Sequence, residues 1–356
     1  MVPQPAPVDI VSGRWKAEGL DEPPDDSVVG TPQRRPSSIR RTAHINMTWP
    51  GGHGSSMHLT GRSRDLLSGA DGSPRVLGEA RMHVVAGEAR TIAAISTVPE
   101  RAGVGSLVGA SGGQRFRAAI DAALPGEREA ATPLYFLLDD IAGCTLIGGF
   151  AWSQHGGLVY PEGAGVGAGP GADHPMRTRN GRVICSGLRP DGYHQISRQR
   201  GVEVPHYLRV AGDLDSGDDP WAWHEIDSAP EVCMRRRRRL DAWWEGEDIV
   251  VDGHFRDSMW SRDHHELSLH EYTLSATIRA DTHLLLAIEA TPRVLPFPEC
   301  PWAGPHVGDL VGMPVDGFRT SVQDALTELH CCTHLNDMLR GLAEVPPLAR
   351  SLLEAP

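Results

Sequence analysis

The chain has 356 residues, 40% of them hydrophobic and 22% charged, which excludes a chain that is disordered throughout. Its 46 acidic and 34 basic side chains give a formal net charge of -12, which argues against nucleic acid or an anionic membrane as partner. Lys16 is the only lysine, so a folded phosphate loop with its lysine and a pyridoxal phosphate Schiff base are excluded, and neither cofactor is expected.

Targeting signals are lacking. No window approaches 18 consecutive apolar residues, and Met1 to Pro7 does not resemble a signal peptide, so we expect a cytoplasmic protein without a membrane partner. The six cysteines then stand in a reducing compartment, where core, metal-binding or reactive thiols are commoner than disulfides.

Composition divides the chain into five segments. The prolines and missing apolar periodicity of the start predict a flexible tail. Glycine and proline dominate the middle, where GGLVYPEGAGVGAGPG predicts a linker, and the prolines that follow exclude a dinucleotide loop there. The predicted segments are a tail over 1–35, a first unit over 36–152, a linker over 153–230, a second unit over 231–348 and a tail over 349–356.

The second unit shows strand periods followed by helical ones. The stretches RRRRLDAWWEGEDIVVDGHFRDS and EYTLSATIRADTHLLLAIEATP break at Glu245-Gly246 and Ala280-Asp281, which predicts about four antiparallel strands. Two apolar stripes at helical spacing then predict two helices. The stripes are Val315, Phe318, Val322 and Leu326, and Leu335, Met338, Leu339 and Leu342.

A weak internal repeat relates the two units. The aligned pairs keep their order: HINMTW with RLDAWW, Gly61 and Asp65 with Gly253 and Asp257, LVG at 107–109 with LVG at 310–312, and Cys144 with Cys332. In this alignment Leu146 stands against His334, and His270 falls near Gly78. We therefore predict an α+β fold of two related units, a decayed duplication, each an antiparallel β-meander packed with two helices.

The candidate chemistry lies in HCCTHLNDMLRGL, residues 330–342. Thr333 is predicted to cap a helix, which places Cys332 near unpaired N–H groups that favour a thiolate. We expect Cys332 to have a lowered pKa and to act as nucleophile or metal ligand, with His334 as the nearest base. His270 and Cys300 would complete a tetrahedral zinc site, although the spacing matches no standard zinc finger. Alternatively, Cys332 is a buried core residue and His334 a surface or capping residue.

The second unit resembles the bacterial domain of unknown function 2889 family, and the chain from about Arg40 looks like its longer actinobacterial members. The motifs that carry the resemblance are RRRRRLDAW, HFRDS, HEYTLSATI, IEATPRVLPFPEC, LVGMPVDGF and CTHLNDML. The resemblance implies recurring polar positions at Asp257, His270, Glu289, Cys300, Cys332, Thr333 and His334, whereas His330 and Cys331 are not among them. The resemblance does not indicate which reaction, if any, the protein catalyses.

Two classes of function follow. The first is a small-molecule enzyme of hydrolase or lyase type, with Cys332 and His334 at its centre and Asp257 or Glu289 as general base or orienting group. Its metal set would be His270, Cys300, Cys332 and His334, holding zinc or iron; without metal, Cys332 and His334 would perform thiol chemistry. The alternative is a non-catalytic binding or accessory protein with a structural Cys/His site. The sequence does not indicate the oligomeric state.

Overall fold

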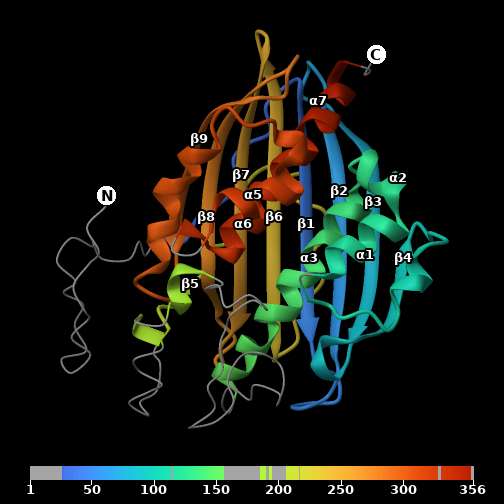
Figure 1. The fold of residues 1–356 in the computed structure, drawn as a ribbon, viewed down its shortest axis with the longest axis vertical. Coiled ribbons are helices and arrows are strands. Elements are labelled where there is room, and N and C mark those ends of the chain that lie inside the picture. The colour runs from blue at the N-terminus through green and yellow to red at the C-terminus, as the bar shows by residue number, and fades with distance from the viewer. Residues whose placement is uncertain are drawn as a thin grey trace.

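The computed structural model describes residues 26–113, 115–155, 185–189, 192–194, 206–215, 217–327 and 330–353. These residues form one nine-stranded antiparallel sheet with the order β4-β3-β2-β1-β6-β7-β8-β5, and β9 pairs with β8 beside β5 (Figure 1). The strands are β1 (Ser38–Thr48), β2 (Met57–Ser68), β3 (Pro74–Ala86), β4 (Ile92–Val98), β5 (Arg209–Val210), β6 (Cys233–Glu245), β7 (Asp248–Trp260), β8 (Glu266–Arg279) and β9 (Leu285–Val294).

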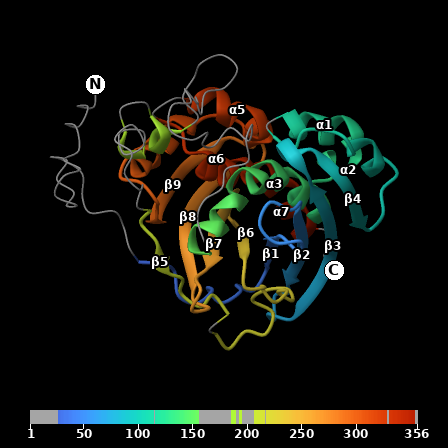
Figure 2. The ribbon, with the colours of Figure 1, turned by 90° about the horizontal axis from the view of Figure 1, so that it is seen from below.

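The helices lie on one face of this sheet (Figure 2). In the first half they are α1 (Arg115–Ala123), α2 (Pro125–Glu129) and α3 (Pro133–Ile147), with 3-10 turns at Glu88–Arg90, Val104–Leu107 and Gly148–Gln154. In the second half they are α5 (Phe318–Ala325), α6 (Thr333–Arg340) and α7 (Val345–Leu353), with 3-10 turns at η5 (Cys300–Leu310), Val315–Gly317 and η8 (Gly341–Glu344). A further 3-10 turn, Ser186–Leu188, lies between the halves in sequence.

The α+β prediction is confirmed, and each described half is a four-stranded meander followed by helices. The predicted break at Gly246 is a two-residue hairpin turn between β6 and β7, where Gly246 has a φ of 64° that suits glycine. Within each half, the described residues contain three α-helices after the meander rather than two. Strands β1 and β6 pair along the centre of the sheet and join the halves. Their origin by duplication stays a prediction.

The face away from the helices is covered by segments of the predicted tail and linker (Figure 2). Ser27 Oγ donates a hydrogen bond of 2.7 Å to Glu271 on β8. Arg34 pairs with Asp219 at 2.8 Å, which joins the two covering segments. Residues 26–34 and 206–230 therefore contribute contacts to the folded body, and α7 runs beyond the boundary predicted at 348.

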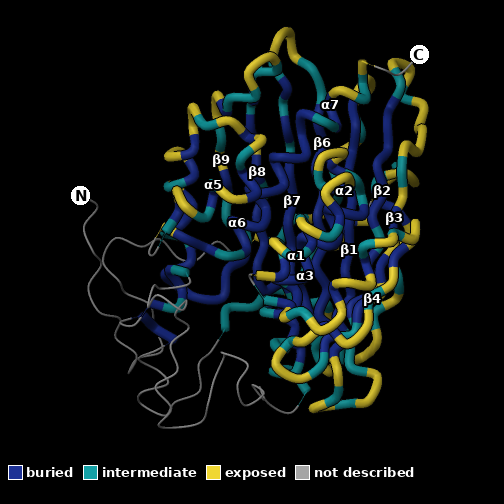
Figure 3. Tube along the Cα trace, turned by 45° about the vertical axis from the view of Figure 1, so that its right-hand side comes forward, coloured by how far each residue is buried: buried dark blue, intermediate teal, exposed yellow. Residues whose placement is uncertain are grey.

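A buried ionic layer lies between the sheet and the helices, and Figure 3 shows how deeply this middle of the molecule is buried. In the arginine run of β6 the side chains alternate, as strand geometry requires. Arg236 and Arg238 both reach Asp140 of α3, at 3.1 and 2.9 Å. Arg235 and Arg237 bond instead to Asn46 and Asp215. These arginines are therefore paired inside the protein, as buried charges require.

One helical run among the described residues, Pro133–Gln154, is long and apolar enough to cross a membrane. Its most apolar window is 78% buried inside the fold, against β1, β2 and β3. It therefore has the position of a core helix.

Candidate metal centre

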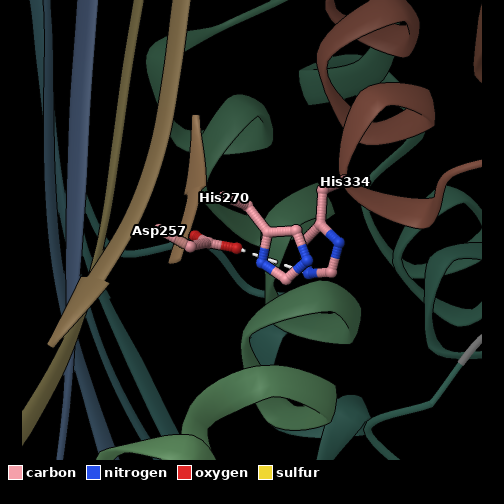
Figure 4. A group of neighbouring side chains, drawn as sticks. All are labelled: Asp257, His270 and His334. Carbon is pink, nitrogen blue, oxygen red and sulfur yellow. Dashed lines mark ion pairs between the residues drawn. The ribbon is translucent and has the colours of Figure 1, made fainter. Parts of the chain in front are cut away.

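Strand pairing places the first two residues of the site. Asp257 on β7 and His270 on β8 are direct register partners, and the register shifts between Asp257 and Ser258. Such a bulge re-aims side chains and often lies beside functional sites. Asp257 and His270 are only 0% and 5% exposed. Both side chains point toward His334 (Figure 4).

Helix α6 brings His334 to the same point. The rings of His270 and His334 stack with centroids 3.5 Å apart and planes inclined by 19° (Figure 4). His334 Nε2 lies 3.6 Å from Asp257 Oδ2. One oxygen or nitrogen atom of each residue lies within 4.8 Å of the others, so the three side chains could hold a metal ion. The sequence predicted Asp257 only as base or orienting group, not as a ligand.

Both histidines are held neutral by their surroundings. Burial lowers the pKa of His334 to about 4. Burial, together with the nearby His334 and Arg236, holds the pKa of His270 well below its ordinary value. A neutral imidazole has a lone pair available for a metal. Among the described residues, the buried Nδ1 of His270 has no hydrogen-bond partner, which an unseen ion or water would explain.

Arg236 fixes the orientation of Asp257. Its Nε and Nη2 donate to the two carboxylate oxygens at 2.8 and 2.9 Å. Its Nη1 donates to Asp140 and Asp337 at 3.1 and 2.9 Å. Burial opposes the charge of Arg236, yet Asp257 and the neighbouring acids hold its pKa above the ordinary value. Each carboxylate oxygen has a second lone pair, so Oδ2 remains able to bind a metal.

A cavity of about 50 Å³ lies beside the two histidines. Its apolar walls include Leu146, Ile147, Phe150, Leu188, Pro296 and Phe297. Three cysteines, Cys185, Cys300 and Cys332, also line it. Cys300 and Cys332, predicted as metal ligands, thus lie at the cavity but outside the set of converging ligand atoms. The site combines a small apolar chamber with a polar wall.

The environment of Cys332 corrects two expectations. Cys332 itself caps α6, one residue before the predicted cap Thr333, and its carbonyl accepts from Asn336 N at 2.8 Å. Burial raises the pKa of Cys332, which outweighs the lowering effect of the hydrogen bond from Tyr272 and of nearby backbone N–H groups. The predicted low pKa is therefore wrong, because the helix start lies inside the protein. Burial likewise raises the pKa of Cys300.

Glu289, predicted as a base, is not brought to the cluster. It is exposed on β9, opposite Ser275, and its nearest polar contact is with Thr291 at 3.5 Å. Side chains alternate along a strand, and the buried neighbour Ala290 occupies the inward position.

The corresponding place in the first half has the carboxylate Asp65, but Gly78 and Leu134 in place of histidines. Asp65 is the register partner of Gly78, and the register shifts directly after Asp65, as it does after Asp257. The sequence alignment places Gly78 near His270, and this strand register agrees with it. Leu134 is the second residue of α3, as His334 is of α6. Cys144 lies near the end of α3, whereas Cys332 lies at the start of α6.

Several residues that contact or line the site were not predicted from the sequence. Tyr272 donates a hydrogen bond of 3.4 Å to Cys332. Cys185 and His194 line the cavity from the segment predicted to be a linker. Their only sequence signal was a pair of metal-binding residue types within a glycine-rich stretch. The sequence did not show which of the five consecutive arginines contacts Asp257; in the structure it is Arg236.

Comparisons with curated proteins and with solved structures found no match. A family model does match, over residues 234–347, and it is described as a protein of unknown function, DUF2889. This range contains Asp257, His270 and His334. The segment that carries the whole candidate metal centre is therefore similar to the DUF2889 family.

Proposed function

We propose that the chain is a metal-dependent enzyme of hydrolase or lyase type, with zinc or iron(II) held by Asp257, His270 and His334. One observation carries this proposal. A carboxylate and two imidazoles converge within 4.8 Å in a buried setting beside a cavity. Two histidines with one carboxylate suit both metals and leave coordination positions open.

The surroundings match what a metal would require. The lowered pKa of His334 and His270 leaves them neutral at pH 7, as ligands must be. Arg236 holds Asp257 from behind through two hydrogen bonds, and such outer contacts orient ligands in metal sites. When bound with an open position, the metal would activate water or polarise a substrate carbonyl.

The substrate is expected to be small and largely apolar. The cavity of about 50 Å³ is lined mainly by aliphatic and aromatic side chains. A cavity of this size holds only a few water molecules, so a larger substrate would enter only if the wall moved. The protonated thiols of Cys300 and Cys332 would act as wall or as additional ligands, since a metal deprotonates a coordinating thiol.

The test is elemental metal analysis of untagged protein at known concentration. Wild type is expected to carry about one zinc or iron per chain in the buried centre, by the stoichiometry of a single site. Asp257→Asn, His270→Ala and His334→Ala should lose it. Glu289→Ala, which changes an exposed carboxylate outside the cluster, should keep it. Circular dichroism of each variant checks folding. Metal-free wild type that cannot be reloaded with either metal would refute the proposal.

Burial favours one alternative, a structural metal in a non-catalytic binding protein. His334 from α6 and Asp257 and His270 from the sheet are each no more than 7% exposed, as in closed structural sites. A structural metal should raise Tm by many degrees, and its removal should unfold α6. A catalytic metal should leave Tm nearly unchanged when it is removed. Thermal unfolding before and after chelation separates the two functions.

A further inference from the structure

A second group of metal-binding side chains lies at the surface. His306 and Asp309 belong to η5, and His330 lies two residues before Cys332. The rings of His306 and His330 stack with centroids 3.5 Å apart and planes inclined by only 10°. His306 Nδ1 lies 3.4 Å from Asp309 Oδ2. One ligand atom of each residue lies within 4.8 Å of the others.

We propose that His306, Asp309 and His330 form a second, exposed zinc site. Two imidazoles and a carboxylate are borderline nitrogen and oxygen donors that suit Zn²⁺ better than Ca²⁺ or Mg²⁺. The set supplies three ligands, and water completes a tetrahedral shell. Because Asp309 and His330 are exposed, zinc bound here exchanges readily with zinc ions in solution, unlike an ion in the buried centre.

The position of the surface site gives it a consequence for the cavity. Helical turn η5 begins at Cys300, and His330 precedes Cys331 and Cys332. Cys300 and Cys332 both line the cavity. The carbonyl of Cys331 accepts a hydrogen bond of 2.9 Å from Ser186 N, which also lines it. Zinc at the surface site would therefore link two segments that form the cavity wall, and this link would restrict the opening of the cavity.

The first experiment counts zinc. Wild type and the variants His306→Ala, Asp309→Ala and His330→Ala are titrated with zinc chloride against a chromophoric chelator, after elemental analysis has fixed the metal already carried. Each variant should take up one equivalent fewer than wild type, as expected for one site.

Matched controls come from other surface histidines. His58→Ala breaks a contact of 3.2 Å with His83, and His283→Ala breaks a pair of 2.7 Å with Asp316. Both controls should bind as much zinc as wild type. Equal uptake by wild type and His330→Ala would overturn the surface site, whatever the metal content of the buried centre.

The second experiment tests whether zinc at the surface site restricts the opening of the cavity. The rate at which a thiol reagent labels the cysteines is measured with and without zinc. Zinc should slow labelling several-fold in wild type and leave the rate in His330→Ala unchanged. Equal slowing in both proteins would contradict this role, because the zinc would then act elsewhere, for example on the thiols directly.

Discussion

Arg236 and Asp257 are direct register partners on β6 and β7, and they meet through two parallel hydrogen bonds. The same guanidinium also binds one acid from α3 and one from α6. A single side chain therefore joins both halves of the molecule to the candidate metal centre. Four predictions concern this region, the buried histidines and the cavity thiols.

Removal of the Arg236 charge should be strongly destabilising. Arg236→Met leaves Asp257, Asp140 and Asp337 without their shared cation, and breaking a buried pair in this way costs about 3–5 kcal/mol. The control is Arg279→Met, which breaks surface pairs with Glu247 and Asp248 and should cost under about 1 kcal/mol. Urea unfolding measures both. A similar loss in the two variants would contradict the prediction.

Phe255 should be the apolar support of the site. It is fully buried, with its ring 4.7 Å from the Arg236 guanidinium and 6.2 Å from the His334 ring. Phe255→Ala should lower the free energy of unfolding by about 3–5 kcal/mol. Phe255→Leu, which keeps more of the volume, should cost under about 1.5 kcal/mol. Tryptophan fluorescence during urea unfolding would show the difference, and equal costs would exclude this role.

Acid should destabilise the protein through its buried histidines. Burial, with lesser contributions from neighbouring cations and histidines, lowers the pKa of His44 to about 2 and that of His224 to about 3. The unfolded state binds these protons from about pH 6.5 downward, whereas the folded state resists them. Stability is therefore full above pH 6.5 and falls as the pH drops toward the folded pKa, by about 1.4 kcal/mol per pH unit for each histidine.

Two variants isolate this effect. His44→Asn removes one of the two titrating rings and should reduce the slope of stability against pH below 6. Thr42→Val removes only the hydroxyl that contacts His224 at 2.8 Å, so the slope should be retained. Urea unfolding from pH 7 to pH 4 gives both slopes. An unchanged slope in His44→Asn would contradict the assignment.

The cavity thiols should react slowly in the native protein. Burial raises the pKa of Cys300, Cys332 and Cys185, and the thiolate is the reactive form. Labelling by a disulfide reagent at pH 8 should be at least about tenfold slower in buffer than in denaturing urea. Labelling of Cys332→Ala under the same conditions shows how much of the labelling in wild type is due to Cys332. Rapid native labelling of Cys332 would restore the nucleophile that the sequence suggested.

The sequence could predict the strands of the second half because alternation and turn residues such as Gly246 report local geometry. It also proposed His270 and His334 as candidates, from the helix start and the family resemblance, and the structure brings their two rings together. It could not show that Asp257 lies opposite His270, since strand register depends on pairing between segments. The low pKa expected for Cys332 was wrong because a local helix position does not reveal how deeply that position is buried.

The central pairing of β1 with β6 has a consequence for any chain that has only the second unit. Without β1, the edge of β6 would present unpaired backbone groups over most of its length, together with a run of arginines. Such an edge is a template for another strand, and an antiparallel copy of β6 would satisfy it by two-fold symmetry. The first unit therefore supplies, through β1, the strand that covers this edge within the same polypeptide.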